Sequence, residues 1–582
     1  MILKYLGKRG WILVAISAVF MFIHCYLNLE IPGYMSAITK VLEDGGSRDE
    51  VTRYGRAMIY CALGSLIFSL LLAWTSSRVA ASMSTTLRKE LFEKVSTFSI
   101  SEIDHFSTAS LINRFTNDIS QIQRMIVMGI NALTEAPIIA TLALIKISAG
   151  SWQWFAVTTI TVVFMLIVFA IVMHYVIPRF RKIQALSDDV NRVAEENITG
   201  VRIVRAFNAE AYQENRSNKA DEVLTSNNLS ARHAMSVMTP FVDSMMDMLT
   251  LSIYWIGAIL IVNAAVIDRL DIFSNMVVFS SYALHIIFSF VFLIMTLIQL
   301  PRSLVSSKRV QEVLDTEPSI KSGSLVKDLR YEGGSIEMKN VSFRYDDSSD
   351  YVLKDISFSV DSGETLAIIG ATGSGKTTLI NLILRFYDAS EGSITIDGSD
   401  IKEYDLENLR RKFGYASQKP VIFAGTVDFN VGYGLPPEVD REKEVRRALD
   451  IAQASSFVDK LEGGVQYKLS QGGTNLSGGQ RQRISIARAV CRKSEILLFD
   501  DSFSALDYRT DRDLRDSLRK ECSNTTKVIV AQRVTSIMNA DKILVIDEGR
   551  VVGLGKHDDL LKNCEVYREI AQSQLSEEEL MQ

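Results

Sequence analysis

Six long apolar stretches in the first half of the chain limit what it can fold into more than any other feature. Each has about 20 mostly apolar residues, the length that an α-helix needs to cross the hydrocarbon core of a bilayer. The third is the least regular, because Asn131, Glu135 and Pro137 interrupt it. Six spans would place both ends of this region on the same side of the membrane. The predicted spans are residues 11–29, 57–77, 125–147, 152–177, 240–267 and 273–300.

The composition agrees with a membrane part joined to a soluble part. Of the 582 residues, 47% are apolar, yet 23% are still charged. The formal net charge of -5, without a basic patch that contains aromatic residues, argues against nucleic-acid binding. The five cysteines show no CxxC pair and no metal-binding spacing, which favours buried thiols in a reducing compartment.

Basic residues predict the orientation of the spans. Lysine and arginine gather in two long connections, residues 78–124 and 179–232, whereas the connection at 148–151 carries no charge. By the positive-inside rule, both long connections, the N-terminus and the C-terminal half are cytoplasmic. The long connections are polar and largely free of glycine and proline, so we expect the membrane helices to continue through them into the cytosol.

Several ionisable residues lie inside or beside the predicted spans, where charges usually face a cavity or a partner. Asp243 and Asp247 are four residues apart and therefore share a helix face. One hypothesis is that they form a negative wall of a translocation cavity and favour cationic substrates. The alternative places them at the membrane interface or satisfies them within the bundle. The ionisable residues are His24, Glu30, Glu135, Lys146, His174, Asp243, Asp247 and His285.

Two motifs in the C-terminal half are typical of phosphate binding. The first, GATGSGKT at residues 370–377, follows a strand-like run and matches the P-loop pattern GxxxxGK[ST]. In that motif, backbone N–H groups and the lysine hold phosphates, and the last hydroxyl ligates Mg²⁺. The second, LSGGQ at residues 476–480, directly precedes a helix-forming run. Its glycines and the helix start predict an anion-binding site.

Together these motifs, about a hundred residues apart, resemble the ATP-binding cassette (ABC) family. The resemblance implies an all-α six-helix transmembrane domain with long cytoplasmic helix extensions, followed by an α/β P-loop ATP-binding cassette domain. We expect the membrane domain at residues 1–314, a linker at 315–335 and the nucleotide domain at 336–582. Breaks at 103–118 and 200–210 are similar to the stretches around the coupling helices of ABC exporters, which dock onto the nucleotide domain.

The resemblance also implies the cofactors ATP and Mg²⁺ and a set of site residues. Tyr345 would stack on adenine, and Asp507 would lie in a loop along a dimer interface. The Mg²⁺ ion would be held by Thr377, Gln418 and Asp500, and the catalytic positions would be Asp501, Gln532 and Gln418. The positions expected to bind ATP are Tyr345, Gly370, Thr372, Gly373, Ser374, Gly375, Lys376, Thr377, Thr378, Ser477, Gly478, Gly479, Gln480 and Asp507.

Two positions depart from the family pattern. Asp501 stands where the family usually has a glutamate as general base, so its carboxylate is one methylene further from the attacking water. Gln532 stands where the family usually has a histidine, and an amide cannot carry a positive charge or relay a proton. Beside intact phosphate-binding motifs, both changes predict a site that holds ATP but hydrolyses it poorly.

This pairing resembles the degenerate-site subunit of bacterial heterodimeric multidrug ABC exporters. Such a chain would export a hydrophobic or amphipathic, drug-like or lipid-like substrate across the cytoplasmic membrane with a second half-transporter subunit. Its LSGGQ would complete the competent site on the partner. The expected protein is a multi-pass protein of a bacterial cell membrane with both termini in the cytoplasm.

Two alternatives remain, of which the first keeps the same fold and the second belongs to a different functional class. One is a homodimer with two slow, equal sites, and the other is an ATP-gated channel or binding module. The six spans and LSGGQ disfavour a soluble P-loop enzyme. No peptidase domain precedes the first span, so we do not expect an exporter that processes its own peptide cargo.

Overall fold

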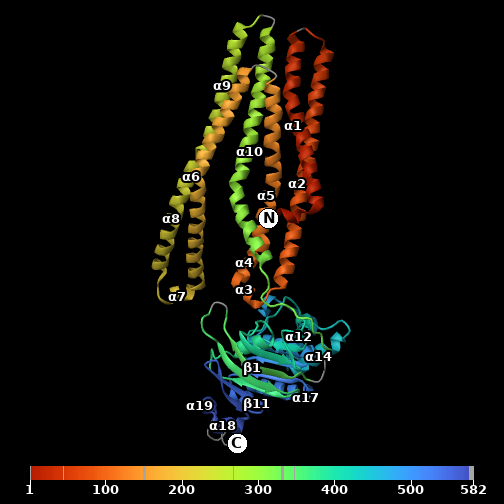
Figure 1. The fold of residues 1–582 in the computed structure, drawn as a ribbon, viewed down its shortest axis with the longest axis vertical. Helices are drawn as coiled ribbons and strands as arrows, with labels where there is room; N and C mark the ends of the chain where they lie inside the picture. The colour runs from red at the N-terminus through yellow and green to blue at the C-terminus, as the bar shows by residue number, and fades with distance from the viewer. Residues whose placement is uncertain are drawn as a thin grey trace. The chain divides into compact units, whose positions relative to one another are not determined.

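The computed structural model describes residues 2–43, 45–148, 152–265, 268–328, 333–345 and 348–575. The chain divides into two compact units (Figure 1). The first, here called the helical unit, comprises residues 1–94 and 109–316. The second, the α/β unit, comprises residues 95–108 and 317–582.

The helical unit is dominated by long α-helices (Figure 1). Within the described residues, six helices are long and apolar enough to cross a membrane, which confirms the predicted all-α membrane domain. The long helices are α1 (Gly7–Glu43), α2 (Arg48–Ser96), α5 (Ile119–Ser148), α6 (Trp152–Thr199), α9 (Met238–Asn263) and α10 (Arg269–Asp315). The shorter elements are η1 (Ile2–Leu6), α4 (Thr108–Asn113), a π-helical turn η2 (Arg114–Asp118), α7 (Val201–Ala206) and α8 (Glu210–Ser236).

The surface of these helices is apolar. Tyr60 is 70% exposed and Ile160 is 66% exposed, and many other large apolar side chains are exposed along the same helices. In water such a surface would be unfavourable, but lipid tails solvate it. The helical unit is thus suited to a bilayer by its surface as well as by the length of its helices.

The helices are more continuous than the sequence suggested. The sequence predicted an irregular third span, yet α5 runs through Asn131, Glu135 and Pro137 without a break. Helices tolerate such residues in a membrane, because leaving the helix would expose more unpaired backbone groups to lipid. As expected, α2 and α6 extend well past their apolar parts, to Ser96 and Thr199.

Ion pairs satisfy several of the charges in the helical unit. Lys146 on α5 donates to Glu30 on α1 at 2.9 Å, and Lys40 on α1 pairs with Asp271 on α10 at 2.5 Å. Helix α1 packs against both α5 and α10. Because an isolated charge is costly at membrane depth, the half-buried Lys146–Glu30 pair favours this contact between α1 and α5. The Lys40–Asp271 pair is exposed and lies outside the predicted spans, so it adds little.

In the α/β unit, the main sheet has the strand order β12-β11-β3-β10-β9-β6. All its neighbouring strands are parallel except β11 and β12. Its strands are β3 (Thr365–Ile369), β6 (Phe413–Ala416), β9 (Ile496–Asp500), β10 (Thr526–Val530), β11 (Lys542–Asp547) and β12 (Arg550–Gly555). In a parallel sheet, all the carboxyl ends lie along one edge, where ligand sites form.

An antiparallel sheet with the order β2-β1-β4-β5 stands beside the main one. Its strands are β1 (Ile336–Phe343), β2 (Leu353–Val360), β4 (Glu391–Ile396) and β5 (Ser399–Asp400), and β7 (Gly425–Thr426) pairs separately with β8 (Lys468–Leu469). The helices of this unit are α3 (Ile100–Phe106), α11 (Lys376–Ile383), α12 (Leu406–Arg411), α13 (Val427–Val431), α14 (Arg441–Ile451), α15 (Ser455–Val458), α16 (Gly478–Cys491), α17 (Tyr508–Glu521), α18 (His557–Asn563) and α19 (Glu565–Gln572). Short 3₁₀ turns are η4 (Gly464–Gln466), η5 (Gln471–Gly473) and η6 (Val534–Ser536).

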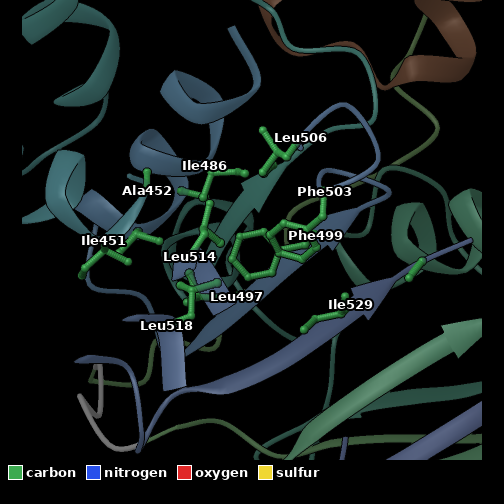
Figure 2. Close-up of a cluster of buried hydrophobic side chains, with 14 of the residues drawn as sticks. Ile451, Ala452, Ile486, Leu497, Phe499, Phe503, Leu506, Leu514, Leu518 and Ile529 are labelled. Atoms are coloured by element: carbon green, nitrogen blue, oxygen red, sulfur yellow. The ribbon is translucent and has the colours of Figure 1, made fainter. Parts of the chain in front are cut away.

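Alternating side chains of the main sheet enter two apolar cores. On β3, Leu366 and Ile368 join the core that contains α11, whereas Ala367 and Ile369 join the core that contains α14, α16 and α17. Successive residues of a strand point to opposite faces, so a strand covered on both faces must be apolar throughout. Figure 2 shows the second core, where Phe499 of β9 lies among side chains from the covering helices.

One short helix between the membrane spans folds with the α/β unit. Glu102 of α3 is 8% exposed, and its carboxylate accepts the backbone N–H of Ser99 at 2.7 Å and that of Ser319 at 3.0 Å. The Tyr387 hydroxyl donates to Asp104 at 3.4 Å. The first predicted break therefore contains a helix attached to the α/β unit, as expected. The helix of the second break, α7, belongs to the helical unit.

A buried charge cluster links three segments of the α/β unit. The Lys412 side chain is 1% exposed and donates to Asp397 at 2.9 Å and to Glu495 at 2.6 Å. The desolvation of three charges is offset only while all of them remain paired.

We therefore predict that Lys412→Met destabilises the α/β unit by about 3–5 kcal/mol, because two carboxylates lose their buried cation. Thermal unfolding of the purified chain should show the transition of this unit lowered by about 10 °C. The matched control is Lys339→Met, which removes an exposed pair with Glu337 and should shift the transition little. Equal shifts for the two variants would contradict the prediction.

Candidate functional site: a nucleotide-binding edge

The loop after β3 has the backbone geometry of a phosphate cradle. Gly375 has φ +98° directly before α11, in the left-handed region that favours glycine. A Cβ atom at Gly370 would lie 2.0 Å from the carbonyl oxygen of Ile546, so no side chain fits there. The loop thereby brings its N–H groups and the start of α11 together, as anion binding requires.

Lys376 is held against this loop. Its ammonium donates to the carbonyl oxygens of Gly370 at 2.8 Å and Ala371 at 2.7 Å. Burial lowers the pKa of Lys376, and the nearby carboxylates of Asp501 and Asp500 oppose that shift. A bound phosphate would add negative charge beside this cation and favour its protonated form.

A hydroxyl and a carboxylate meet beside the loop. The Thr377 hydroxyl donates to Asp500 at 3.2 Å, and Asp500 is 1% exposed at the carboxyl end of β9. Burial raises the pKa of Asp500, while the hydrogen bond from Thr377 lowers it. In the described residues, no three His, Cys, Asp or Glu side chains form a metal cluster. The Thr377 hydroxyl and the Asp500 carboxylate are two oxygen donors at one place. They fit Mg²⁺, which in phosphate sites is usually held by one or two protein oxygens, substrate phosphates and water.

Two glutamine amides converge on the carboxylate of Asp501. Gln532 donates to its Oδ2 atom at 2.8 Å, and Gln418 donates to the same atom at 3.4 Å. Asp501 has φ +47° and is 8% exposed, so its carboxylate points into a constrained, poorly hydrated place. Burial raises the pKa of Asp501, and the amide of Gln418 opposes the shift.

An aromatic group lies beside the start of α11. The Tyr345 hydroxyl is 3.0 Å from that of Thr378, and its ring meets Phe343 edge-on, with centroids 4.9 Å apart. The Tyr387 ring, which the sequence analysis did not single out, meets Tyr345 edge-on at 5.3 Å. The structure thus brings the predicted adenine-stacking residue to the same loop as the predicted phosphate ligands.

The LSGGQ segment forms a capped helix start of its own. The Ser477 hydroxyl accepts from the backbone N–H of Gln480 at 3.3 Å, and the Gln480 side chain accepts from that of Ser477 at 2.8 Å. Ser477 and Gln480 bond to each other and not to the P-loop. Gly479 lies close to the carbonyl of Ala505, and Asp507 caps α17 through the N–H of Thr510 at 3.1 Å.

Ser502 is a site-shaping residue that the sequence did not reveal. Its hydroxyl is fully buried and donates at 2.8 Å to the carbonyl of Ala416, two residues before Gln418. This bond ties the segment after β9, which carries Asp501, to the end of β6, which is followed by Gln418. The only sequence signal is its position directly after two aspartates.

Comparisons with known proteins agree with this architecture. Residues 14–290 match the family described as the ABC transporter transmembrane region, and residues 353–504 match the ABC transporter family. An uncharacterized ABC transporter ATP-binding protein of Mycobacterium tuberculosis is 34% identical over 97% of this chain and 96% of its own length. The ATP-dependent lipid A-core flippase of Hahella chejuensis is 31% identical over 86% of this chain and 84% of its own length.

A solved structure shares the fold over nearly the whole length. It is that of a bacterial Atm1-family ABC exporter with ATP bound, with a TM-score of 0.80, 24% identity and 99% coverage of both chains. The present chain belongs to the ABC transporter family. In this chain a membrane domain and an ATP-binding domain are fused, with the same fold as that solved exporter structure. Proteins of this class bind and hydrolyse ATP and work as dimers in a membrane.

The Thr377–Asp500 contact leads to a prediction about Mg²⁺. Thr377→Val keeps the side-chain shape but removes the oxygen, so affinity for ATP in the presence of Mg²⁺ should fall about tenfold. Affinity measured in EDTA should be unchanged, because no phosphate contact of the loop is lost. Nucleotide titrations of the purified chain, with and without Mg²⁺, test this.

The neighbouring residue provides the control. Thr378→Val removes the contact with Tyr345 but no expected metal ligand, so the ratio of the two affinities should stay at the wild-type value. If Thr377→Val also leaves this ratio unchanged, the Thr377 hydroxyl is not a ligand of Mg²⁺.

Proposed function

We propose that this chain is one half of an ABC exporter dimer that moves a hydrophobic or amphipathic substrate, drug-like or lipid-like, across a bacterial cytoplasmic membrane. The apolar span surfaces and the exporter architecture support this proposal. Relatives whose names state that they are lipid A-core flippases, at 31% and 29% identity, support a lipid-like substrate. The basic residues of the long connections support cytoplasmic termini.

In the proposed site, each predicted residue has a separate task. The loop N–H groups and Lys376 bind the phosphates, and Tyr345 stacks on the adenine. Thr377, Gln418 and Asp500 hold Mg²⁺, which when bound would neutralise charge on the phosphates. Asp501 would orient the attacking water and accept its proton.

The observation that carries the degenerate-site proposal is the contact between Gln532 and Asp501. The Oδ2 atom of Asp501 accepts both glutamine amides, so the oxygen that would receive a proton already has two donors. Gln532 cannot stabilise extra negative charge as a protonated histidine can. Asp501 is also shorter than the usual glutamate, and a general base must lie within hydrogen-bond reach of the water. The short side chain of Asp501 and the two donors already bonded to its Oδ2 atom thus both oppose catalysis at this P-loop.

One observation favours the second candidate, a homodimer with two slow, equal sites. Burial raises the pKa of Asp501, and a carboxylate with a raised pKa is a stronger base. If a water reaches the other carboxylate oxygen, slow turnover follows at both sites of a homodimer. The two candidates differ in the activity of the chain without a partner.

The LSGGQ segment supports a composite site on a partner subunit. The capping box of Ser477 and Gln480 uses the N–H groups of those two residues and holds the start of α16 in a helical conformation. The N–H groups of Gly478 and Gly479 remain for an anion. In the proposed dimer, this helix start closes over ATP bound to the partner's P-loop. Closure would reach the membrane helices through α3, which the α/β unit holds at Glu102 and Asp104.

The first test is the ATPase activity of the purified chain in lipid, alone, with its partner subunit and as the double variant Asp501→Glu/Gln532→His. We expect the chain alone to be nearly inactive. The double variant should gain at least about tenfold, because one misplaced catalytic group costs about that much or more. Brisk turnover by the unmodified chain alone would instead establish the homodimer.

A second test uses the asymmetry of a heterodimer. Ser477→Arg should reduce the ATPase of the assembled pair more than about tenfold, because it blocks the competent site. Lys376→Ala should reduce it only about twofold, because the affected site hydrolyses little. ATPase assays of the co-purified pair measure both, and the homodimer requires the two losses to be similar.

A further inference from the structure

A cavity lies between α5 and α10 in the helical unit. It holds about 330 Å³ and is lined by Gln121, Arg124, Met125, Met128, Gln299 and Arg302. Two guanidinium groups, two amides and two thioethers thus surround one space. Both arginines are exposed, whereas the amides and thioethers are half-buried.

The cavity lies at one end of the spans. Met125 is where the third apolar stretch begins, and Leu300 is where the sixth one ends. The chain reaches α5 from α3 through α4 and η2, and α10 leads at Asp315 into the α/β unit, so the chain connects both of these ends to the nucleotide-domain side. The site is therefore placed where the headgroups of the leaflet on that side would lie.

The polar groups of the cavity are donors suited to an anion. The Arg124 guanidinium donates to Gln121 Oε1 at 2.6 Å, which holds the planar group and leaves the Gln121 amide N–H groups as further donors. Guanidinium groups match carboxylates and phosphates because they offer two parallel N–H bonds. The cavity thus offers several donors at one place.

Acidic residues on and beside the two helices are few. Helix α10 has no Asp or Glu between Asp271 and Glu312, and Glu135 is the only acid of α5. Glu312 pairs with Arg114 at 3.0 Å, and the Ser306 hydroxyl donates to Asp118 at 2.6 Å. The Ser306 hydroxyl does not neutralise Asp118, which lies on η2 three residues before Gln121. Arg124 and Arg302 outnumber this one carboxylate, so the net charge around the cavity is positive.

The two methionine thioethers indicate whether the cavity suits a soluble anion or an amphiphile. Met125 and Met128 are three residues apart on α5 and provide an adaptable apolar wall beside the arginines. A small inorganic anion gains nothing from such a wall, whereas an alkyl chain next to the anionic group does.

We propose that this cavity binds the anionic head, phosphate or carboxylate, of an amphiphile that enters from the leaflet on the nucleotide-domain side. The inference rests on the proposed export function in one respect, that the bound amphiphile belongs to the class of molecules exported. It opposes the cationic substrates that Asp243 and Asp247 suggested. Both of those side chains are exposed on α9, and neither lines the cavity.

The test is a binding measurement on the full chain in phosphatidylcholine nanodiscs without ATP. The probes are dodecyl phosphate, dodecyl maltoside and inorganic phosphate, which separate the head from the tail. Dodecyl phosphate should bind at least about tenfold tighter than either of the others, because charged hydrogen bonds and tail burial act together.

Charge-removing variants locate the site. Arg124→Gln and Arg302→Gln should each weaken dodecyl phosphate binding about tenfold, and the matched control Arg232→Gln, an exposed position on α8, should not change it. Arg124→Lys/Arg302→Lys should bind with intermediate affinity, because charge remains without the bidentate geometry. Met125→Ser/Met128→Ser should weaken dodecyl phosphate but not inorganic phosphate. Thermal unfolding of each variant identifies any that fail to fold.

The outcomes separate this inference from the proposed function. Equal binding of dodecyl phosphate and dodecyl maltoside, or unchanged binding by the folded arginine variants, would overturn the anion site. If inorganic phosphate binds as tightly as dodecyl phosphate, the proposal that the ligand is an amphiphile from the membrane is overturned. ATP-driven transport of dodecyl phosphate is then assayed in vesicles with the assembled pair. If dodecyl phosphate binds through the arginines but is not transported, the anion site is retained. The inference that its ligand belongs to the exported class of molecules is then rejected.

Discussion

Parallel pairing of β3, β10 and β9 is the constraint on which the nucleotide site depends. Because the three strands are parallel and adjacent, the loop after β3 and the carboxylate after β9 come to the same edge of the sheet. The Thr377–Asp500 hydrogen bond, at 3.2 Å, is the direct consequence. Gln532 follows β10, between the two, and so reaches Asp501. Apolar cores on both faces of the sheet hold these strands, and therefore this edge, in place.

Both units contain charged side chains that are paired with opposite charges in poorly hydrated surroundings. In the helical unit, Glu30 is satisfied by Lys146 across two helices. In the α/β unit, Lys412 is satisfied by two carboxylates. Each cluster is favourable only when complete, because a buried or lipid-embedded charge without its partner keeps its desolvation cost. Such clusters specify which helices and strands are neighbours more than they add stability.

Helix α3 folds with the α/β unit although it lies between membrane helices along the chain. The helix is joined covalently to α2 and α4, yet its acidic side chains bond to Ser319 and Tyr387. Tyr387 in turn meets the ring of Tyr345. The ring of Tyr387 and its hydroxyl thus connect Tyr345 at the nucleotide edge with Asp104 of α3, within the α/β unit.

The sequence by itself determined the elements with strong local signals. Apolar stretches of membrane-spanning length predicted the six helices, and GxxxxGK[ST] after a strand predicted the loop before α11. The roles of the site residues remain predictions. Only the tertiary structure decided which distant groups meet: that Glu30 pairs with Lys146, that Gln418 and Gln532 share one oxygen of Asp501, and that two arginines border one cavity. These contacts join residues far apart in the chain, and periodicity and spacing report only on neighbours along one element.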